Sequence, residues 1–317
     1  MATDTRLDRT RPIDEAPVRT LNPHDVPMLR IGSHQAVSGR EVRAALRAHP
    51  GRSVWSPDSR EFVLMSAWRH RDDISLVQSI AAVRDAEALL IGAVARCRAF
   101  GEALVLVIEL DERRNPLFYA RTGFAPLEDV VTYELGAPVR LTEVAAVSFV
   151  PFRGGDGSAL AALVGLDHAA FPWLWRNTES EFEAYAETPG VETFLGFEGD
   201  RPVAYVGVTS YGGWGHLDRI AVDPARQGEG LGRVALAFAV DALVRRGARR
   251  VGLSTQRDNV SSRRLYERFG FRRMHDHDYR LYGARLRPPA TELASAIHSD
   301  GSGTTADHRG VGNRGSG

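Results

Sequence analysis

The chain has 317 residues, of which 43% are hydrophobic and 25% are charged, a composition typical of globular proteins and a length that fits about two domains. Lysine and arginine number 40, as do aspartate and glutamate, so the net charge of +0 gives no electrostatic reason to expect nucleic acid or a membrane surface as a partner. The single cysteine, Cys97, excludes an internal disulfide and a thiolate zinc cluster, and we expect it to be a packed core thiol.

The two ends of the chain differ in composition from the rest. Residues 1–26 mix arginine with acidic residues and lack the apolar stretch of a signal peptide, and residues 289–317 are rich in Gly, Ser, Thr and His. We expect both segments to be disordered. No run approaches the roughly 18 apolar residues of a membrane helix, which favours a soluble, cytoplasmic protein.

Residues 27–137 form a first segment in which predicted strands and helices alternate. In chain order the pattern predicts a strand at Phe62–Met65, a helix at about Ala86–Phe100, a strand at Ala103–Ile108, a short helix near Phe118 and a closing strand around Val130–Tyr133.

Residues 138–288 show a clearer pattern. The predicted elements are a strand at Val147–Phe152, helices at Ala159–Ala170 and Glu179–Ala186, strands at Glu192–Phe197, Pro202–Ser210 and His216–Val222, a helix at about Gly230–Arg246, a strand at Val251–Thr255, a helix at Asn259–Phe269, and strands near Phe271 and Tyr279. The long helix carries one apolar stripe and ends at Gly247, a residue suited to a C-terminal cap.

The two segments resemble each other over one short stretch. Phe118–Phe124 (FYARTGF) parallels Leu265–Phe271 (LYERFGF), and each copy ends a short helix with glycine before an aromatic residue. A duplicated fold is the simplest explanation, with chance as the alternative because the match is short.

The strongest chemical signal is the loop between Val222 and the long helix. Gly228, Gly230 and Gly232 stand at alternate positions there, so backbone N–H groups can crowd together at a helix N-terminus without Cβ obstruction. Arg226 and Arg233 add positive charge. This arrangement predicts a ligand that carries phosphate, and it matches neither the dinucleotide-binding glycine pattern nor a P-loop.

This loop resembles the diphosphate-binding loop of the GNAT acetyltransferases, Gln/Arg-x-x-Gly-x-Gly/Ala, which Gln227, Gly230 and Gly232 fill. The resemblance extends through Asn259, Tyr266 and Gly270 and covers roughly residues 147–283. It implies an α/β protein of two GNAT-like domains, each a twisted, mostly antiparallel mixed sheet flanked by helices. It also implies acetyl-CoA as co-substrate, with no metal.

The resemblance implies roles for individual residues. The family's cofactor contacts would fall on Ile220, Ala221, Val222, Gln227, Gly228, Glu229, Gly230, Leu231, Gly232, Arg233 and Asn259. Tyr266, seven residues after Asn259 on the same helix face, would be the general acid that protonates the departing thiolate. The alternatives are a packed aromatic ring at Tyr266 and a helix cap at Asn259.

A general base has to deprotonate the attacking amine. His216 occupies the position that matches the glutamate base of the histone acetyltransferase branch, and histidine ordinarily titrates near neutrality. Asp218 would point to the same strand face and so could orient or replace it. The alternative is a strand-end histidine without a chemical role.

Two other stretches carry weaker signals. Phe171–Trp175 lies where the family lines its acceptor pocket, although ordinary packing explains it equally well. His275–Asp278 suggests a metal site, but alternation on a strand would place its histidines and aspartates on opposite faces, which disfavours one.

The first segment has no glycine loop, because Arg84–Leu90 stands at the corresponding place, and Glu112 stands seven residues before Tyr119, with Asn115 nearby. We therefore expect residues 27–137 to be a degenerate GNAT-like domain that does not bind CoA, and residues 138–288 to be the catalytic domain. The predicted reaction is direct acetyl transfer to a primary amine of a small molecule or a protein. The alternatives are a small-molecule acetyltransferase like mycothiol synthase, which has two domains and a similar length, and a CoA-binding module without turnover.

Overall fold

The computed structural model describes residues 18–31, 37–110, 115–138 and 147–287. We call the chain up to Ala137 the first half and the chain from Pro138 the second half. The elements of the first half are β1 (Arg19–Thr20), η2 (Val26–Met28), α1 (Gly39–Ala48), β2 (Val54–Trp55), β3 (Phe62–Ala67), η3 (Trp68–His70), β4 (Ile74–Ala81), α2 (Ala86–Ala99), β5 (Leu104–Leu110), α3 (Pro116–Arg121) and β6 (Ala125–Gly136).

The second half follows the predicted order. Its elements are β7 (Ser148–Phe152), α4 (Gly157–Ala170), η4 (Trp173–Trp175), α5 (Glu179–Glu187), β8 (Val191–Glu198), β9 (Arg201–Tyr211), β10 (Trp214–Val222), η5 (Pro224–Arg226), α6 (Leu231–Arg245), β11 (Arg250–Gln256), α7 (Val260–Phe269), β12 (Arg272–Arg273), η6 (His275–His277) and β13 (Tyr279–Arg285).

The expected disordered arm is partly ordered. Residues 18–26 lie within it, yet β1 pairs with β2, and Leu21 and Val26 are buried in the core of the first half. Few large apolar residues precede this point, so composition alone did not reveal the short edge strand. Residues 1–17 and the expected tail from residue 289 lie outside the described residues.

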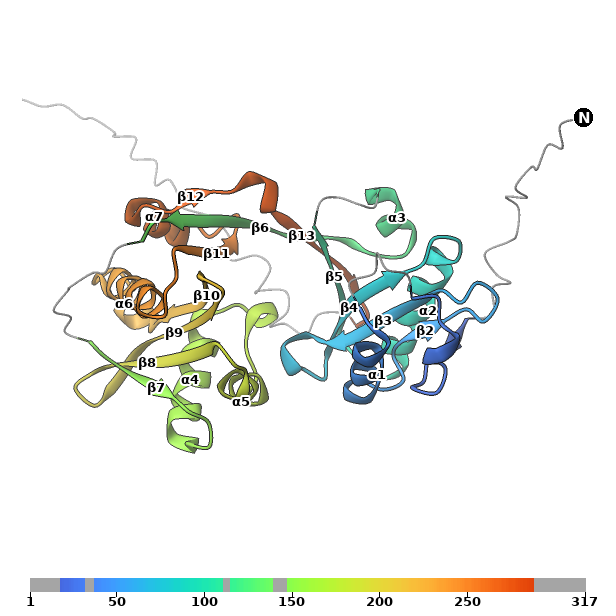
Figure 1. Cartoon of the computed structure of the whole chain (residues 1–317), viewed down its shortest axis with the longest axis horizontal. Coiled ribbons are helices and arrows are strands. Elements are labelled where there is room, and N and C mark those ends of the chain that lie inside the picture. Colours follow the sequence, from blue (N-terminus) through green and yellow to red (C-terminus); the bar gives the residue numbers. More distant parts are fainter. Residues whose placement is uncertain (1–17, 32–36, 111–114, 139–146, 288–317) are drawn as a thin grey trace, which may run out of the picture.

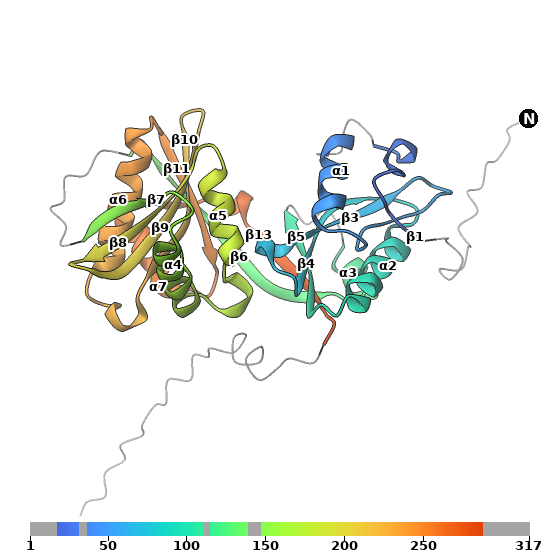
Figure 2. The ribbon, with the colours of Figure 1, turned by 90° about the horizontal axis from the view of Figure 1, so that it is seen from below.

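The two halves exchange their last strands. The described strands form one continuous sheet in the order β1-β2-β3-β4-β5-β13-β6-β11-β10-β9-β8-β7. β13, from the end of the second half, pairs with β5, whereas β6, from the end of the first half, pairs with β11. Figures 1 and 2 show β6 and β13 crossing side by side between the two lobes. The expected closing strand of each segment thus completes the sheet of the other.

The short sequence repeat folds as the same turn twice. At the end of α3, Gly123 N–H donates to Ala120 and Phe124 N–H donates to Tyr119, at 3.2 and 2.9 Å. At the end of α7, Gly270 and Phe271 donate to Glu267 and Tyr266 at 3.1 and 3.0 Å. Both glycines have positive φ, 86° and 111°, which explains why glycine stands at each end.

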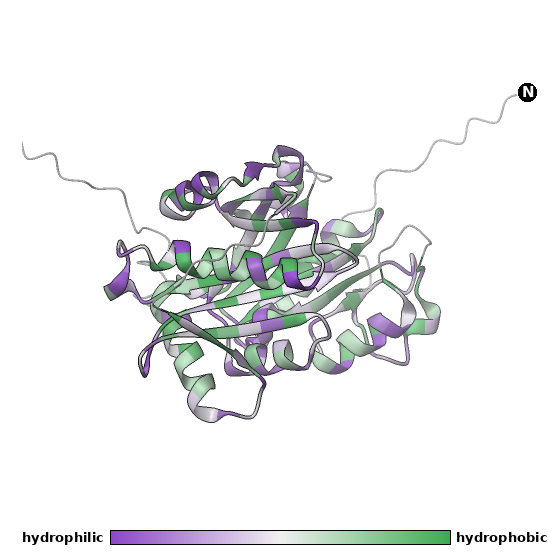
Figure 3. Cartoon of the chain, turned by 60° about the vertical axis from the view of Figure 1, so that its left-hand side comes forward, coloured by the Kyte–Doolittle hydropathy of each residue, from purple (hydrophilic) through white to green (hydrophobic). Residues whose placement is uncertain are grey.

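Helices cover both faces of the second half's sheet. α6 and α7 contribute to one core with the sheet, and α4 and α5 contribute to another on the opposite side. Figure 3 shows hydrophobic residues concentrated on the strands and hydrophilic ones on loops and outer helix faces. Each face of this sheet is therefore buried under its own pair of helices, which cover the apolar side chains of that face.

A polar clamp joins the first half to η4 of the second. Trp68 Nε1 donates to the carbonyl of Leu174 at 2.7 Å, and Arg71 Nη1 donates to the carbonyl of Trp173 at 2.6 Å. Arg69 Nη1 donates to Asn177 Oδ1 at 2.7 Å. These bonds fix the aromatic segment that closes one end of the cavity described below.

Candidate active site

The central feature of the candidate site is a gap between two parallel strands. β10 and β11 pair from Trp214 and Arg250 to Leu217 and Leu253, and their pairing then stops although both strands continue. A cavity of about 1950 Å³ opens there. Of the predicted site residues, the ones lining it are His216, Ile220, Ala221, Val222, Gln227, Gly228, Gly230, Gly232, Arg233, Asn259 and Tyr266.

The glycine loop forms one end of this cavity. Gly228 and Gly230 have φ of 89° and 87°, and a Cβ at either position would meet no atom within 4 Å. Gly230 is the N-cap of α6 and offers no side chain to the N–H groups of the first helical turn. Those donors and the helix dipole are therefore suited to an external anion.

Two loop residues do not line the cavity, and one expected cation is already engaged. Leu231 is buried in the core, and Glu229 pairs with Arg226 at 2.7 Å. Arg226 also pairs with Glu198 at 2.7 Å, and these two carboxylates raise the pKa of its guanidinium. The positive charge that Arg226 was expected to add to the loop is therefore paired with Glu198 and Glu229.

Tyr266 and Asn259 both lie on α7 beside the gap. Asn259 is the N-cap, and its side chain accepts from the N–H of Ser262 at 3.1 Å, so the capping interpretation is confirmed. Tyr266 is 4% exposed, and burial raises its pKa to about 12, an effect that the Ser262 hydroxyl partly offsets. The phenol is accordingly protonated at neutral pH.

His216 and Asp218 form a hydrogen-bonded pair on β10. His216 Nδ1 lies 2.7 Å from Asp218 Oδ1, and Asp218 Oδ2 accepts from the Thr209 hydroxyl at 2.6 Å. A carboxylate partner favours the tautomer with the proton on Nδ1, which leaves Nε2 to accept a proton. The expectation that Asp218 shares the face of His216 is confirmed.

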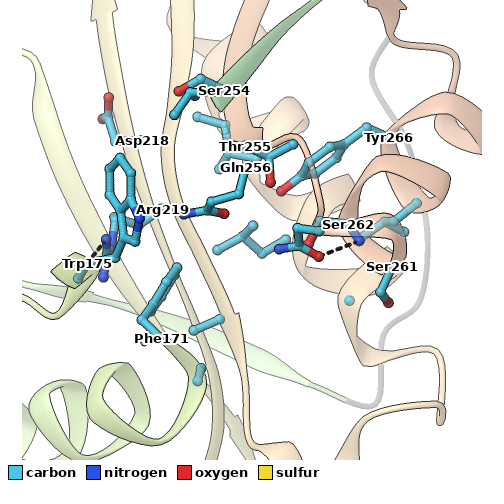
Figure 4. A pocket seen from close by; sticks show the side chains of 18 of the residues that line it. Phe171, Trp175, Asp218, Arg219, Ser254, Thr255, Gln256, Ser261, Ser262 and Tyr266 are labelled. Carbon is cyan, nitrogen blue, oxygen red and sulfur yellow. Dashed lines mark hydrogen bonds between the residues drawn. The ribbon is translucent and has the colours of Figure 1, made fainter. Parts of the chain in front are cut away.

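A buried ionic network supports the wall behind this pair. Arg219 pairs with Asp167, donates to the carbonyl of Trp175 at 2.9 Å and lies 3.7 Å over the ring of Phe171. Tyr205 also donates to Asp167. Figure 4 shows Asp218, Arg219 and Trp175 on one side of the pocket and Ser261, Ser262 and Tyr266 on the other, with Gln256 reaching between them. Phe171 and Trp175 thus both pack and line the cavity.

The corresponding turn of the first half holds an anion of its own. Glu61, which is 6% exposed, accepts hydrogen bonds from the backbone N–H groups of Arg84 and Asp85, at 3.0 and 2.9 Å, where α2 begins. A carboxylate from the protein thus occupies donors that the glycine loop leaves open in the second half. Asn115 caps α3, and Glu112 lies outside the described residues.

The stretch from His275 to Asp278 folds differently from the expected strand. Residues 275–277 form the helical turn η6 and not the expected strand, while Asp278 pairs with Arg273. Within the described ranges, no three His, Cys, Asp or Glu side chains gather as a metal-binding group.

In the same ranges, no helix is long and apolar enough to cross a membrane.

Several cavity residues were not anticipated. Glu128 and Tyr279 lie on the exchanged strands β6 and β13, and Ser254 and Gln256 lie on β11. Glu128 Oε2 accepts from Trp175 Nε1 at 2.5 Å, a contact across the two halves. Nothing in the local sequence around Glu128 signals this contact, because it depends on the strand exchange.

The second half of the chain is similar in sequence to known proteins. Residues 160–271 match the acetyltransferase (GNAT) family. Mycothiol acetyltransferase of Kineococcus radiotolerans is 31% identical over 165 residues, which cover 49% of this chain and 54% of that protein. Streptothricin acetyltransferase of Streptomyces lavendulae is 30% identical over 98 residues, covering 30% of this chain and 52% of that protein. The chain spans about half the length of the curated relatives it matches.

Solved structures extend the likeness of the fold to both halves. A GCN5-related N-acetyltransferase from Kribbella flavida matches with a TM-score of 0.59 at 14% identity, covering 84% of this chain and 70% of that one. A tandem GNAT protein from the clavulanic acid biosynthesis pathway matches with a TM-score of 0.56 at 14% identity, covering 86% of this chain and 99% of that one. The predicted fold class is confirmed.

Proposed function

We propose that this chain, which belongs to the GNAT superfamily, transfers the acetyl group of acetyl-CoA to a primary amine by direct attack in a ternary complex. One observation carries the proposal: the glycine loop, the open edges of β10 and β11, and the Tyr266 phenol all line a single cavity. A phosphate-binding end, a channel with unpaired backbone and a protonated acid are the parts that this reaction needs.

The cofactor would lie along the gap. The N–H groups of the loop and of the first turn of α6 would hold the diphosphate, with contributions from Gln227, Gly228, Glu229, Gly230, Leu231, Gly232 and Arg233. Ile220, Ala221 and Val222 would pair through their backbone with the pantetheine arm, and Asn259 would face it from α7. The N–H near Val222 would polarise the thioester carbonyl.

The chemistry would then proceed in one displacement. His216, oriented by Asp218, takes a proton from the acceptor ammonium, and the freed nitrogen attacks the thioester carbon. The C–N bond forms, the C–S bond breaks, and the thiolate receives its proton from Tyr266. The acylated nitrogen loses its second proton to solvent, and Tyr266 and His216 regain their starting protonation by exchange with solvent. The products are the acetylated amine and CoA, and no covalent intermediate on the protein is needed.

The names of the relatives favour a small-molecule amine over a protein amine as the acceptor. Mycothiol and streptothricin acetyltransferases are named for small molecules, so an acceptor of the mycothiol type is the second candidate. A protein N-terminus or lysine is the less supported choice.

The test is a screen for release of CoA thiol. Purified protein is mixed with acetyl-CoA and each of a panel of primary amines that includes amino sugars, diamines, amino acids and a protein-derived peptide. Amine-dependent thiol release with a matching acetylated product supports the proposal. Tight CoA binding without turnover of any amine would instead favour the CoA-binding module.

A further inference from the structure

Glu128 lies in the cavity of the second half although it belongs to the first. It stands on β6, opposite Leu281 of β13, and reaches the cavity because the exchanged strand pairs with β11. Trp175 Nε1 donates to its Oε2 at 2.5 Å. Ser254 and Tyr279, which line the same cavity, come from the strands on either side of β6.

No cation balances this carboxylate within the described part of the chain. Two arginines that line the same cavity have other partners, since Arg219 pairs with Asp167 and Arg69 donates to Asn177. Asp258, which also lines the cavity, adds negative charge. Burial raises the pKa of Glu128 to about 7; the hydrogen bond from Trp175 lowers it in part, and the charge of Asp258 makes a smaller contribution that raises it.

Three other buried carboxylates of this protein have a cationic or backbone N–H partner within the chain. Glu102 pairs with Arg52 at 2.9 Å, Asp167 pairs with Arg219, and Glu61 accepts from two backbone N–H groups. A half-buried carboxylate without a counter-charge is unfavourable unless a ligand supplies one. Glu128 differs from these three carboxylates in lining a cavity large enough to admit that ligand.

We propose that Glu128 is a specificity-determining residue, which binds the acceptor in its protonated, ammonium form beside the Trp175 ring before His216 removes the proton. This inference rests on the proposed acetyl transfer. It gives the first half a direct part in acceptor recognition, while the second half holds acetyl-CoA. The acceptor class that fits is a small cationic primary amine.

The experiment compares the wild-type chain with Glu128→Gln and with Glu134→Gln. Glu134 lies on the same strand, outside the cavity, and pairs with Arg250 at 3.6 Å, so its variant controls for a lost charge on β6. The amine probes are putrescine, glucosamine and L-lysine, with acetyl-CoA kinetics and thermal unfolding at pH 8 measured in parallel.

We expect Glu128→Gln to raise KM for the amine by about ten- to a hundredfold, the range for losing a hydrogen bond to a charged group. The values of kcat and of KM for acetyl-CoA should change little, and Tm at pH 8 should not fall. An unchanged KM for the amine overturns the inference, and so does a loss of kcat alone, which would make Glu128 the base. A lowered Tm at pH 8 overturns it too, since Glu128 would then be a structural residue.

If the wild-type chain acetylates none of the three amines, this result counts against the proposed acetyl transfer to these amines and not against the role of Glu128. The behaviour of Glu128 is then decided by the thermal measurement. A raised Tm for Glu128→Gln at pH 8 supports the inference that Glu128 lacks a counter-charge until a cationic ligand binds. A lowered Tm rejects that inference.

Discussion

Tyr119 and Tyr266 occupy the same position in two copies of one helix-and-turn, but their hydroxyls meet different surroundings. Tyr119 donates to Glu109 inside the first half, whereas Tyr266 lines the cavity of the second. Both rings are almost fully buried, at 1% and 4% exposure. The pair therefore offers a matched comparison between a structural and a proposed catalytic phenol.

Tyr266→Phe should lower kcat by about 10²–10⁴-fold, the usual contribution of general acid catalysis, while CoA affinity is retained because the ring still packs. Steady-state rates and calorimetric CoA titration measure the two effects. Tyr119→Phe is the control and should leave kcat near the wild-type value. A wild-type rate for Tyr266→Phe across about pH 6 to 9, where chemistry limits, would remove the general-acid role.

His216→Gln should give a smaller loss that depends on pH. Glutamine cannot accept the proton of the ammonium, so the variant should depend on acceptor that is already neutral, and its loss of rate should shrink as pH rises. Profiles of kcat/KM for the amine test this, with Asp218→Asn expected to resemble His216→Gln because it frees the imidazole. Parallel wild-type and variant profiles would make His216 a strand residue without chemistry.

The whole chain should bind one CoA. The glycine loop of the second half is open, whereas the corresponding donors of the first half already hold the Glu61 carboxylate. Calorimetry on the full chain is the suitable measurement, since the exchanged strands join the halves. A stoichiometry of two per chain would contradict the prediction that the first half is degenerate.

Gly230→Val should abolish CoA binding in a folded protein. The new side chain would project into the space required by the diphosphate, and φ of 87° is unfavourable for a branched residue. Gly199→Val, at a turn with φ of 60° and open space around it, introduces similar strain away from the cavity. Equal CoA affinity for Gly230→Val and Gly199→Val would show that the loop is only a connection.

Stability should depend on pH through Glu128. Its pKa is about 7 in the folded protein, above the value of 4.5 expected in the unfolded chain, so folding takes up protons between these values. The loss of folding stability caused by ionising the buried Glu128 is thus absent below about pH 4.5, grows as pH rises and is complete above about pH 7. Thermal unfolding from pH 5 to 8.5 should show Glu128→Gln gaining Tm over wild type towards high pH. A constant difference in Tm over that range would mean that Glu128 does not titrate there.

The order of elements and much of the candidate site were predictable from sequence because their signals are local. The apolar stripe of α6, the glycines before it and the seven-residue spacing of Asn259 and Tyr266 are patterns within short windows. Glu128 and Tyr279 were not predictable, since they reach the cavity through pairings between β6, β11 and β13. Which distant strands pair leaves no periodic pattern in the sequence. The alternation of side chains along β6 and β13 is the same whether each strand stays in the sheet of its own half or joins the sheet of the other.

The strand exchange also governs how the protein can be made. β5 cannot receive its neighbour β13 until residue 285 has left the ribosome, although β5 itself is complete at Leu110. During synthesis the first half therefore carries an open sheet edge over most of the chain's elongation, and open edges invite pairing with other chains. Pairings over such distances slow folding. Truncation before β13 should consequently damage the half that was translated first, and a nascent chain stalled near residue 250 should be a substrate for chaperones.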